Sequence, residues 1–123
     1  MLFKVGDTDY TRKIIQGTYT VNSYDVYKEW QDGNVDIHRA VLKRRISGVF
    51  TMYFGNQTDY QAFLNALETV RKNDGSYTVS IMVNNENSFK TNIDMFIDFR
   101  PTREQKVLGE AWYPELDVSI QGK

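Results

Sequence analysis

The sequence predicts an α+β domain that is mainly β: an antiparallel β-sandwich or strongly curved sheet, with a long hairpin and one flanking amphipathic helix. Three observations indicate this class. Several segments alternate apolar and polar residues, one segment has helical periodicity, and strands precede and follow that helix without the alternation that builds a parallel sheet. The 123 residues contain no internal repeat and no linker rich in Pro or Gly. We therefore expect residues 1–123 to form a single domain.

The first strands are expected to form the long hairpin. Residues 16–30 are rich in β-branched and aromatic side chains, which favour strands. Asp32, Gly33 and Asn34 then tolerate the positive φ that a tight turn requires. Residues 35–45 and 46–54 continue as extended chain. Gly48 is expected to mark a bulge or bend between two stretches of strand, because Gly inside a strand usually indicates a close backbone approach or an irregular ladder.

The helix is predicted by spacing and by capping residues. Thr58 is expected to cap its start, and Gln61 three residues later completes a capping box. Asn73, Asp74 and Gly75 are expected to end it. One apolar stripe with i, i+3, i+4, i+7 spacing is expected to lie on the sheet: Tyr60, Phe63, Leu64, Leu67 and Val70.

A second group of strands follows the helix. Residues 77–83 alternate, residues 84–87 form a polar loop, and residues 89–99 return with the clearest two-faced pattern in the chain. Arg100 and Pro101 are expected to close that strand. A charged connection over residues 102–106 then leads through residues 107–113 to a last strand at residues 116–121.

Charge and composition exclude several classes of function. The formal net charge of -1 gives no electrostatic hold on DNA, RNA or an anionic membrane. We therefore expect neither sequence-specific nucleic acid nor membrane as a partner. The absence of cysteine excludes disulfides and thiolate metal sites, which fits a cytosolic protein without excluding an extracellular one. The start of the chain does not have the pattern of a secretory signal.

No residue pattern supports catalysis, so we expect no enzymatic activity, no metal site and no cofactor. His38 is the only histidine and lies among charged neighbours, which indicates a surface residue. Three oxygen-bearing residues copy the start of a calcium loop: Asp32, Asn34 and Asp36. The loop's required Gly is replaced by Ile37, so a hairpin turn is the better interpretation.

Two further charged groups have a structural explanation. Asp94 and Asp98 share one strand face but lie roughly 13 Å apart, too far for a glycosidase carboxylate pair, which indicates a solvated polar face. Lys43, Arg44 and Arg45 form a basic cluster. Such a cluster can contact phosphates, although charge that protects an edge strand is the expected explanation.

The order of strands, helix and strands resembles the small tail proteins of long-tailed bacteriophages and prophages, which include tube subunits and the ring-forming domain of distal tail proteins. The resemblance covers about residues 24–100, most of the chain. Four segments carry it: DVYKEWQDGNVDIHRAVLKRRISGVFTMYF, TDYQAFLNALETVRKN, SYTVSIMVNN and FKTNIDMFIDF. It rests on arrangement and includes no signature motif. The resemblance implies a non-enzymatic structural protein of the virion tail, made in the host cytoplasm. It also implies rings or a tube formed by strand-to-strand contact, with itself and other tail proteins as partners.

Two sets of residues are expected to serve such an assembly. Eight Tyr, seven Phe and two Trp exceed what one small core needs, although aromatic residues also suit strands. We expect the long hairpin to contribute subunit contacts through Tyr24, Tyr27, Trp30, Val35 and Ile37. A tube channel should not bind DNA tightly, so the expected lumen face consists of Asn92, Asp94 and Asp98, and a row of inward Lys or Arg would contradict it.

Two alternatives stay open at this point. One is a monomeric domain that binds a small ligand or acts as an enzyme, with Tyr and Trp lining a pocket on a curved sheet. The other is an adaptor or chaperone that binds one partner without self-assembly. Convergent polar groups in an apolar cavity would favour the first, and stoichiometry separates the second from a ring subunit.

Overall fold

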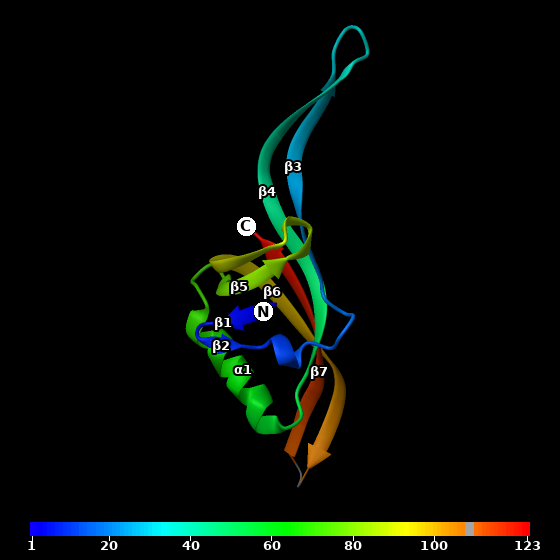
Figure 1. The fold of residues 1–123 in the computed structure, drawn as a ribbon. Helices are drawn as coiled ribbons and strands as arrows, with labels where there is room; N and C mark the ends of the chain where they lie inside the picture. Colours follow the sequence, from blue (N-terminus) through cyan, green and yellow to red (C-terminus); the bar gives the residue numbers. More distant parts are fainter. Residues whose placement is uncertain (108–109) are drawn as a thin grey trace.

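The computed structural model describes residues 1–107 and 110–123, which form one antiparallel sheet of seven strands and one α-helix. The strand order is β2-β1-β5-β6-β7-β4-β3 (Figure 1). The strands are β1 (Phe3–Val5), β2 (Thr8–Asp9), β3 (Thr20–Gln31), β4 (Ile37–Tyr53), β5 (Tyr77–Val83), β6 (Ser88–Val107) and β7 (Glu110–Gly122). The helices are α1 (Gln57–Val70) and two short 3-10 helices, η1 (Thr11–Lys13) and η2 (Asn84–Glu86). The expected α+β, mainly β class is confirmed, in the form of a single curved sheet.

The sheet curves until β3 comes close to the other end of the strand order. The hydroxyl of Tyr19, just before β3, donates to the carbonyl of Met82 and lies 3.2 Å from that of Leu2. The side-chain amide of Asn85 accepts a hydrogen bond from Ser23 N at 2.8 Å and donates to Ser23 O at 2.7 Å. A side chain thus takes the place of a neighbouring strand at this point of β3.

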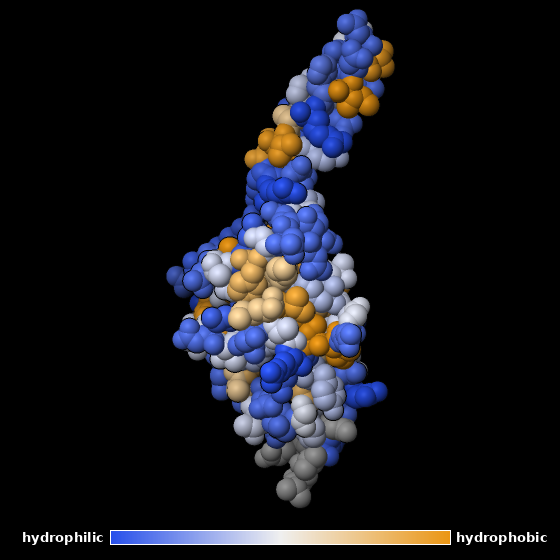
Figure 2. Space-filling model, in the orientation of Figure 1, coloured by the Kyte–Doolittle hydropathy of each residue, from blue (hydrophilic) through white to orange (hydrophobic). Residues whose placement is uncertain are grey.

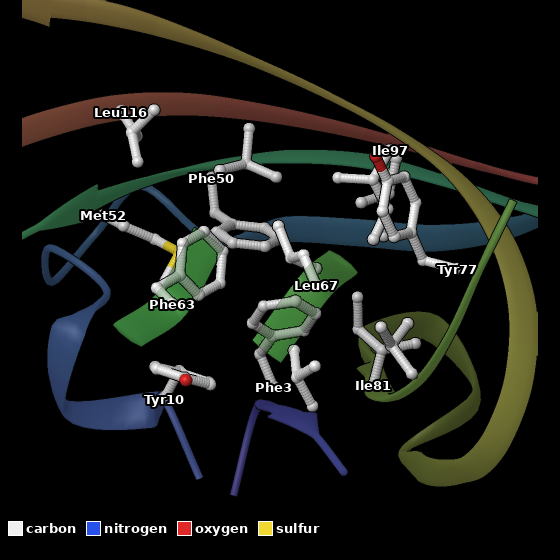
Figure 3. Packing of buried hydrophobic residues seen from close by; sticks show 14 of the residues in the cluster. Phe3, Tyr10, Phe50, Met52, Phe63, Leu67, Tyr77, Ile81, Ile97 and Leu116 are labelled. Atoms are coloured by element: carbon white, nitrogen blue, oxygen red, sulfur yellow. The ribbon is translucent and has the colours of Figure 1, made fainter. Parts of the chain in front are cut away.

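Aromatic rings fill the space between the sheet and α1 (Figure 3). Phe3 from β1 lies 5.2 Å from Phe50 of β4, between ring centroids. Phe63 of α1 contacts Tyr10 at 5.0 Å and Phe54 at 5.3 Å. Since these rings come from four separate parts of the chain, their burial fixes α1 against one face of the sheet. We call the opposite face, which no helix covers, the open face.

The helix is capped two residues earlier than the sequence predicts. Asn56 is the N-cap: its backbone is extended, and its side-chain oxygen accepts from Asp59 N at 2.8 Å. The expected cap at Thr58 is wrong because Asn56 supplies an equally good acceptor first and places Thr58 inside the first turn. The expected apolar stripe is confirmed, with Phe63 and Leu67 buried and its other members partly buried against the core.

Gly48 allows a close approach and does not mark a bulge. A Cβ at this position would lie 2.3 Å from Thr20 O and 2.6 Å from the Cα of Val21. The bulge lies instead at Leu42, the extra residue of β4 between the pairs Val26–Lys43 and Tyr27–Val41. The expected division at Gly48 is therefore wrong, and β4 runs unbroken from Ile37 to Tyr53.

The strand β6 continues through Pro101, contrary to the expected stop there. Proline lacks an N–H group, so it interrupts a strand only where a neighbour needs that donor. The neighbour β5 ends where Tyr77 pairs with Met95, so the β5 side of β6 has no partner at Pro101. Residues 102–106 therefore belong to β6 rather than to a connection. Within the expected segment 107–113, Leu108 and Gly109 lie outside the described residues.

We expect Leu67→Ala to lower the free energy of unfolding by about 2–5 kcal/mol, because Leu67 is buried and its truncation leaves a cavity between α1 and the sheet. Urea denaturation of the variant and the parent measures the difference. A loss below about 1 kcal/mol would show that the stripe contributes little to the core.

Candidate assembly surface

The upper half of the β3–β4 hairpin leaves the body of the protein as a two-stranded ribbon (Figure 1). The strand β4 pairs with β7 only from Ser47 to Tyr53, whereas it pairs with β3 from Ile37 to Val49. Residues 24–45 therefore pair only with each other, and we call them the arm. Isolated two-stranded ribbons are marginally stable in water, so an arm of this length gains from a partner surface.

The pairing register divides the arm into two faces, because residues directly opposite each other in an antiparallel pair share a face. The first face, which we call the balanced face, continues the core side of the sheet. Its residues are Asp25, Tyr27, Glu29 and Gln31 with Arg44, Val41, Arg39 and Ile37. The second, which we call the cationic face, continues the open face. Its residues are Tyr24, Val26, Lys28 and Trp30 with Arg45, Lys43, Ala40 and His38.

The balanced face neutralises its own charges. Arg39 lies 3.4 Å from the Glu29 carboxylate and its guanidinium lies 3.9 Å from the centre of the Tyr27 ring. Arg44 lies 3.7 Å from the Asp25 carboxylate. The apolar side chains between these pairs are exposed: Tyr27, Ile37 and Val41. A protein surface can cover this face without burying an unpaired charge.

The cationic face differs in its charges. Among the described residues, no carboxylate lies within 4 Å of the charged groups of Lys28, Lys43 or Arg45, whereas both arginines of the balanced face are paired. Trp30 stacks on His38 with ring centroids 5.6 Å apart. One arm therefore carries a neutral apolar face and a positively charged face with two aromatic residues, Tyr24 and Trp30.

The arm ends in a turn organised by Asp32. Its carboxylate accepts from the backbone N–H groups of Asn34 and Asp36 and lies 2.6 Å from His38 Nε2. These contacts, that of His38 first, hold the pKa of Asp32 below its ordinary value. Val35 has a φ of 66° and is 71% exposed. A β-branched residue in this left-handed region is strained, by roughly 1–2 kcal/mol.

The structure places the five expected contact residues in three different places. Tyr24 and Trp30 lie on the cationic face, Tyr27 and Ile37 on the balanced face, and Val35 at the tip. All five are exposed. One flat surface of a neighbouring subunit cannot contact both faces and the tip of the arm at once. The role of these five residues in subunit contacts therefore stays a prediction. Figure 2 shows hydrophobic side chains as separate patches along the arm.

Sequence reasoning missed two exposed apolar residues of the arm. Val41 and Leu42 are 57% and 67% exposed. They lie next to the basic cluster of Lys43, Arg44 and Arg45. Because of that cluster, the segment was interpreted as a strand edge protected by charge. The available signal was the break in alternation at Leu42, where the bulge adds one residue.

The three expected lumen residues lie on β6 but in different surroundings. Asp94 contacts Lys72 at 2.8 Å and Thr78 at 2.6 Å, and Lys123 lies 3.8 Å away. Asn92 sits at a positive φ of 51° where β6 is irregular. Asp98 is exposed, and among the described residues no Lys or Arg nitrogen lies within 4 Å of it. Two lysines thus stand at the Asp94 end of this face, and the lumen role stays a prediction.

A hollow of about 460 Å³ lies on the open face where β4, β7 and β6 run side by side. Arg100 approaches the Asp117 carboxylate to 3.9 Å, and Thr51 donates to Asp117 at 3.1 Å. The residues that line the hollow include no Tyr or Trp, which a ligand pocket was expected to have, and its two aromatic residues, Phe50 and Phe99, belong to or pack against the core. The described residues contain no group of three side chains able to hold a metal ion. Nor does any described helix have the length and apolarity to cross a bilayer.

Comparison with protein-family models, curated proteins and solved structures gives no match. The arm and the open face are therefore the basis for inferring function.

Ion pairing at Asp94 predicts how stability depends on pH. Lys72 and then Thr78 hold the pKa of Asp94 below its ordinary value of 3.8. A lowered folded-state pKa gives stability that is present above pH 3.8 and is lost as the pH falls through the lower folded value. We expect Asp94→Asn to be less stable than the parent near neutral pH, with the difference vanishing in acid.

Urea denaturation across a pH series measures this difference. Asp98→Asn is the matched control, because it removes a carboxylate of the same strand that has no cation within ion-pair distance among the described residues. A difference for Asp94→Asn that is constant at all pH values would contradict the role of the ion pair.

Proposed function

We propose that this chain is a non-enzymatic structural subunit that assembles with copies of itself, and with other tail proteins, into rings or a tube in the tail or baseplate of a long-tailed bacteriophage or prophage. The observation that carries the proposal is the balanced face of the arm. There, exposed apolar side chains alternate with charges that are already paired within the chain.

Such a face suits a protein partner better than any other ligand. The centres of protein interfaces are depleted of unpaired charge and enriched in aromatic and aliphatic side chains. Covering Ile37, which is 63% exposed, removes apolar area from water, and the ion pairs of Arg39 and Arg44 need no new partners. The arm projects from the body, so the covering surface belongs to another molecule (Figure 1).

A second copy is the partner that the shape and the resemblance favour. The arm projects at one end of the molecule, and the surface that it would cover on a neighbour lies elsewhere on the chain. A contact between two different surfaces of identical subunits is heterologous, and it produces a closed ring or an open helical tube. Ring-forming tail proteins, which the order of strands, helix and strands along the sequence resembles, assemble in this way.

The open face of the body suits the wall of a channel. The cationic face of the arm, which continues it, carries Lys28, Lys43 and Arg45 and is not part of the wall that we propose. Along β6 and β7 the open face carries charges of both signs, as at Asp98, Arg100 and Asp117, together with the exposed Phe96. A surface of mixed charge does not hold a polyanion tightly, which is what passage of DNA through a tube requires. We therefore keep Asn92, Asp94 and Asp98 as the proposed lumen side.

Shortening the arm tests the proposal. Lys28 and Ala40 lie directly opposite each other, so an Asn-Gly pair in place of residues 29–39 closes a shorter hairpin with a favoured turn. We expect the shortened protein to stay folded and monomeric, whereas the parent increases in mass with concentration. Light scattering gives the mass and circular dichroism reports the fold.

A finer pair of variants separates the balanced face from exposed apolar surface in general. Ile37→Ser with Val41→Ser removes two apolar side chains from the arm, and Tyr53→Ser removes an exposed aromatic side chain from the body. We expect only the arm variant to weaken assembly, by tenfold or more in the concentration required, about 1.4 kcal/mol. A parent that remains monomeric, or an arm variant that assembles as the parent does, would overturn the proposal.

A further inference from the structure

Several backbone edges lack a partner among the described strands. They include the outer edges of β3 and β6, and the parts of β4 and β7 that lie beyond the segment the two strands share. On β3 the edge is free beyond Ser23, where the Asn85 amide ends the contact with η2, and it extends to Gln31. On β6 the edge is free beyond Met95, where pairing with β5 ends. Neither edge receives a backbone hydrogen bond from the described loops over residues 24–31 or 96–101.

The geometry points to a defined contact between copies: the β3 edge of one arm adds antiparallel to the β6 edge of the next copy, with Lys28 opposite Asp98. This inference rests on the proposed function, since it names the strands that join one subunit to the next. Its support comes from backbone direction, side-chain facing and charge.

The backbone of β3 presents the required groups. Both the N–H and the C=O of Ser23 bond to Asn85 on the outer side, so odd-numbered residues of β3 direct their backbone groups outward. At the far end, Asp32 N donates inward to Asp36 O, which confirms the same alternation along the strand. Asp25, Tyr27, Glu29 and Gln31 therefore present free donors and acceptors along the arm.

The backbone of β6 presents a matching set. Phe54 N donates to Pro114 O, so even-numbered residues of β7 face β4 and odd-numbered ones face β6. Asp117 and Ser119 lie opposite Arg100 and Asp98, so even-numbered residues of this part of β6 face β7. The outward groups of β6 are therefore those of Ile97, Phe99 and Pro101. The missing N–H of Pro101 lies on this free edge, where no strand of the same chain needs it.

Side-chain facing agrees with this pairing. The outward-bonding residues of both strands, such as Tyr27 and Phe99, have side chains on the core side of the sheet. The residues between them, such as Lys28 and Asp98, have side chains on the open side. Joining the two edges therefore continues both faces of the sheet from one copy into the next. No one-residue shift of the pairing register is needed to bring the faces into line.

Charge selects one register among those that backbone direction allows. With Lys28 opposite Asp98, two charged groups without an ion pair in the described part of the chain face each other. Trp30 then lies opposite Phe96, and these two aromatic side chains are 47% and 42% exposed. A shift by two residues brings Lys28 opposite Arg100 in one direction, a repulsion, or opposite Phe96 in the other.

The same two edges do not meet within one molecule. In the sheet, β7 and β4 separate β6 from β3, and the arm extends away from the free part of β6 (Figure 1). The contact is therefore heterologous. The two free edges are also offset along the strand direction, and a stagger of this kind is what a sheet needs in order to close into a barrel.

Cysteine cross-linking tests the register, since the chain contains no native cysteine. In this register positions 28 and 98 form a non-hydrogen-bonded pair, in which the Cα atoms lie about 4.5 Å apart and the side chains are close. That separation is within the range of disulfides, so oxidation of mixed Lys28→Cys and Asp98→Cys proteins should give a disulfide-linked dimer. Lys43→Cys mixed with Asp98→Cys is the matched control. Lys43 lies on the same face but one strand further from the edge, opposite Val26, so we expect no link.

Charge exchange provides an independent measurement. We expect Lys28→Asp and Asp98→Lys each to weaken assembly in light scattering, and the protein carrying both changes to recover it. Assembled protein that forms no link between positions 28 and 98, and is indifferent to these charges, would overturn this contact and leave the proposed function standing. A parent that is monomeric up to its solubility limit would overturn both.

Discussion

The stagger between β4 and β7 is the constraint on which the rest of the structure depends. The two strands share seven residue pairs, from Ser47–Gln121 to Tyr53–Glu115, although each is much longer than that. In the shared segment, Phe50, Met52, Leu116, Val118 and Ile120 point to the core and are buried. Outside it each strand keeps only one neighbour. The register of β4 against β7 therefore determines both the core, which lies at the shared segment, and the arm, which begins where β4 extends beyond it.

Much of the fold follows from local patterns in the sequence. The period-two alternation of residues 77–83 and 89–99 and the helical spacing around Leu67 identify elements that the structure confirms, because each pattern reflects burial on one face. The departures have local causes. Asn56 competes with Thr58 as a cap, and Pro101 lies on an edge that no described strand uses. Strand partners are not visible in one sequence, so the sequence did not predict where an edge is free.

The candidate surface was less accessible to sequence reasoning than the fold. The long hairpin was identified from its aromatic residues and its Asp-Gly-Asn turn, and these residues are exposed. Which of them share a face depends on the bulge at Leu42, because one extra residue reverses the phase of β4 relative to β3. The pairing of Arg39 with Glu29 and of Arg44 with Asp25 follows from that phase. The chemical difference between the two faces is therefore a property of the folded register.

The Asn85–Ser23 contact has a consequence for how such a protein varies over time. A side chain in η2 marks the lower limit of the free edge on β3, and η2 itself belongs neither to the arm nor to the core. Substitutions in this short segment alter how many residues β3 offers to a neighbour, while the strand and its packing stay the same. A loop thus sets the extent of the proposed intermolecular sheet, and loops vary in sequence more than the strands that they connect.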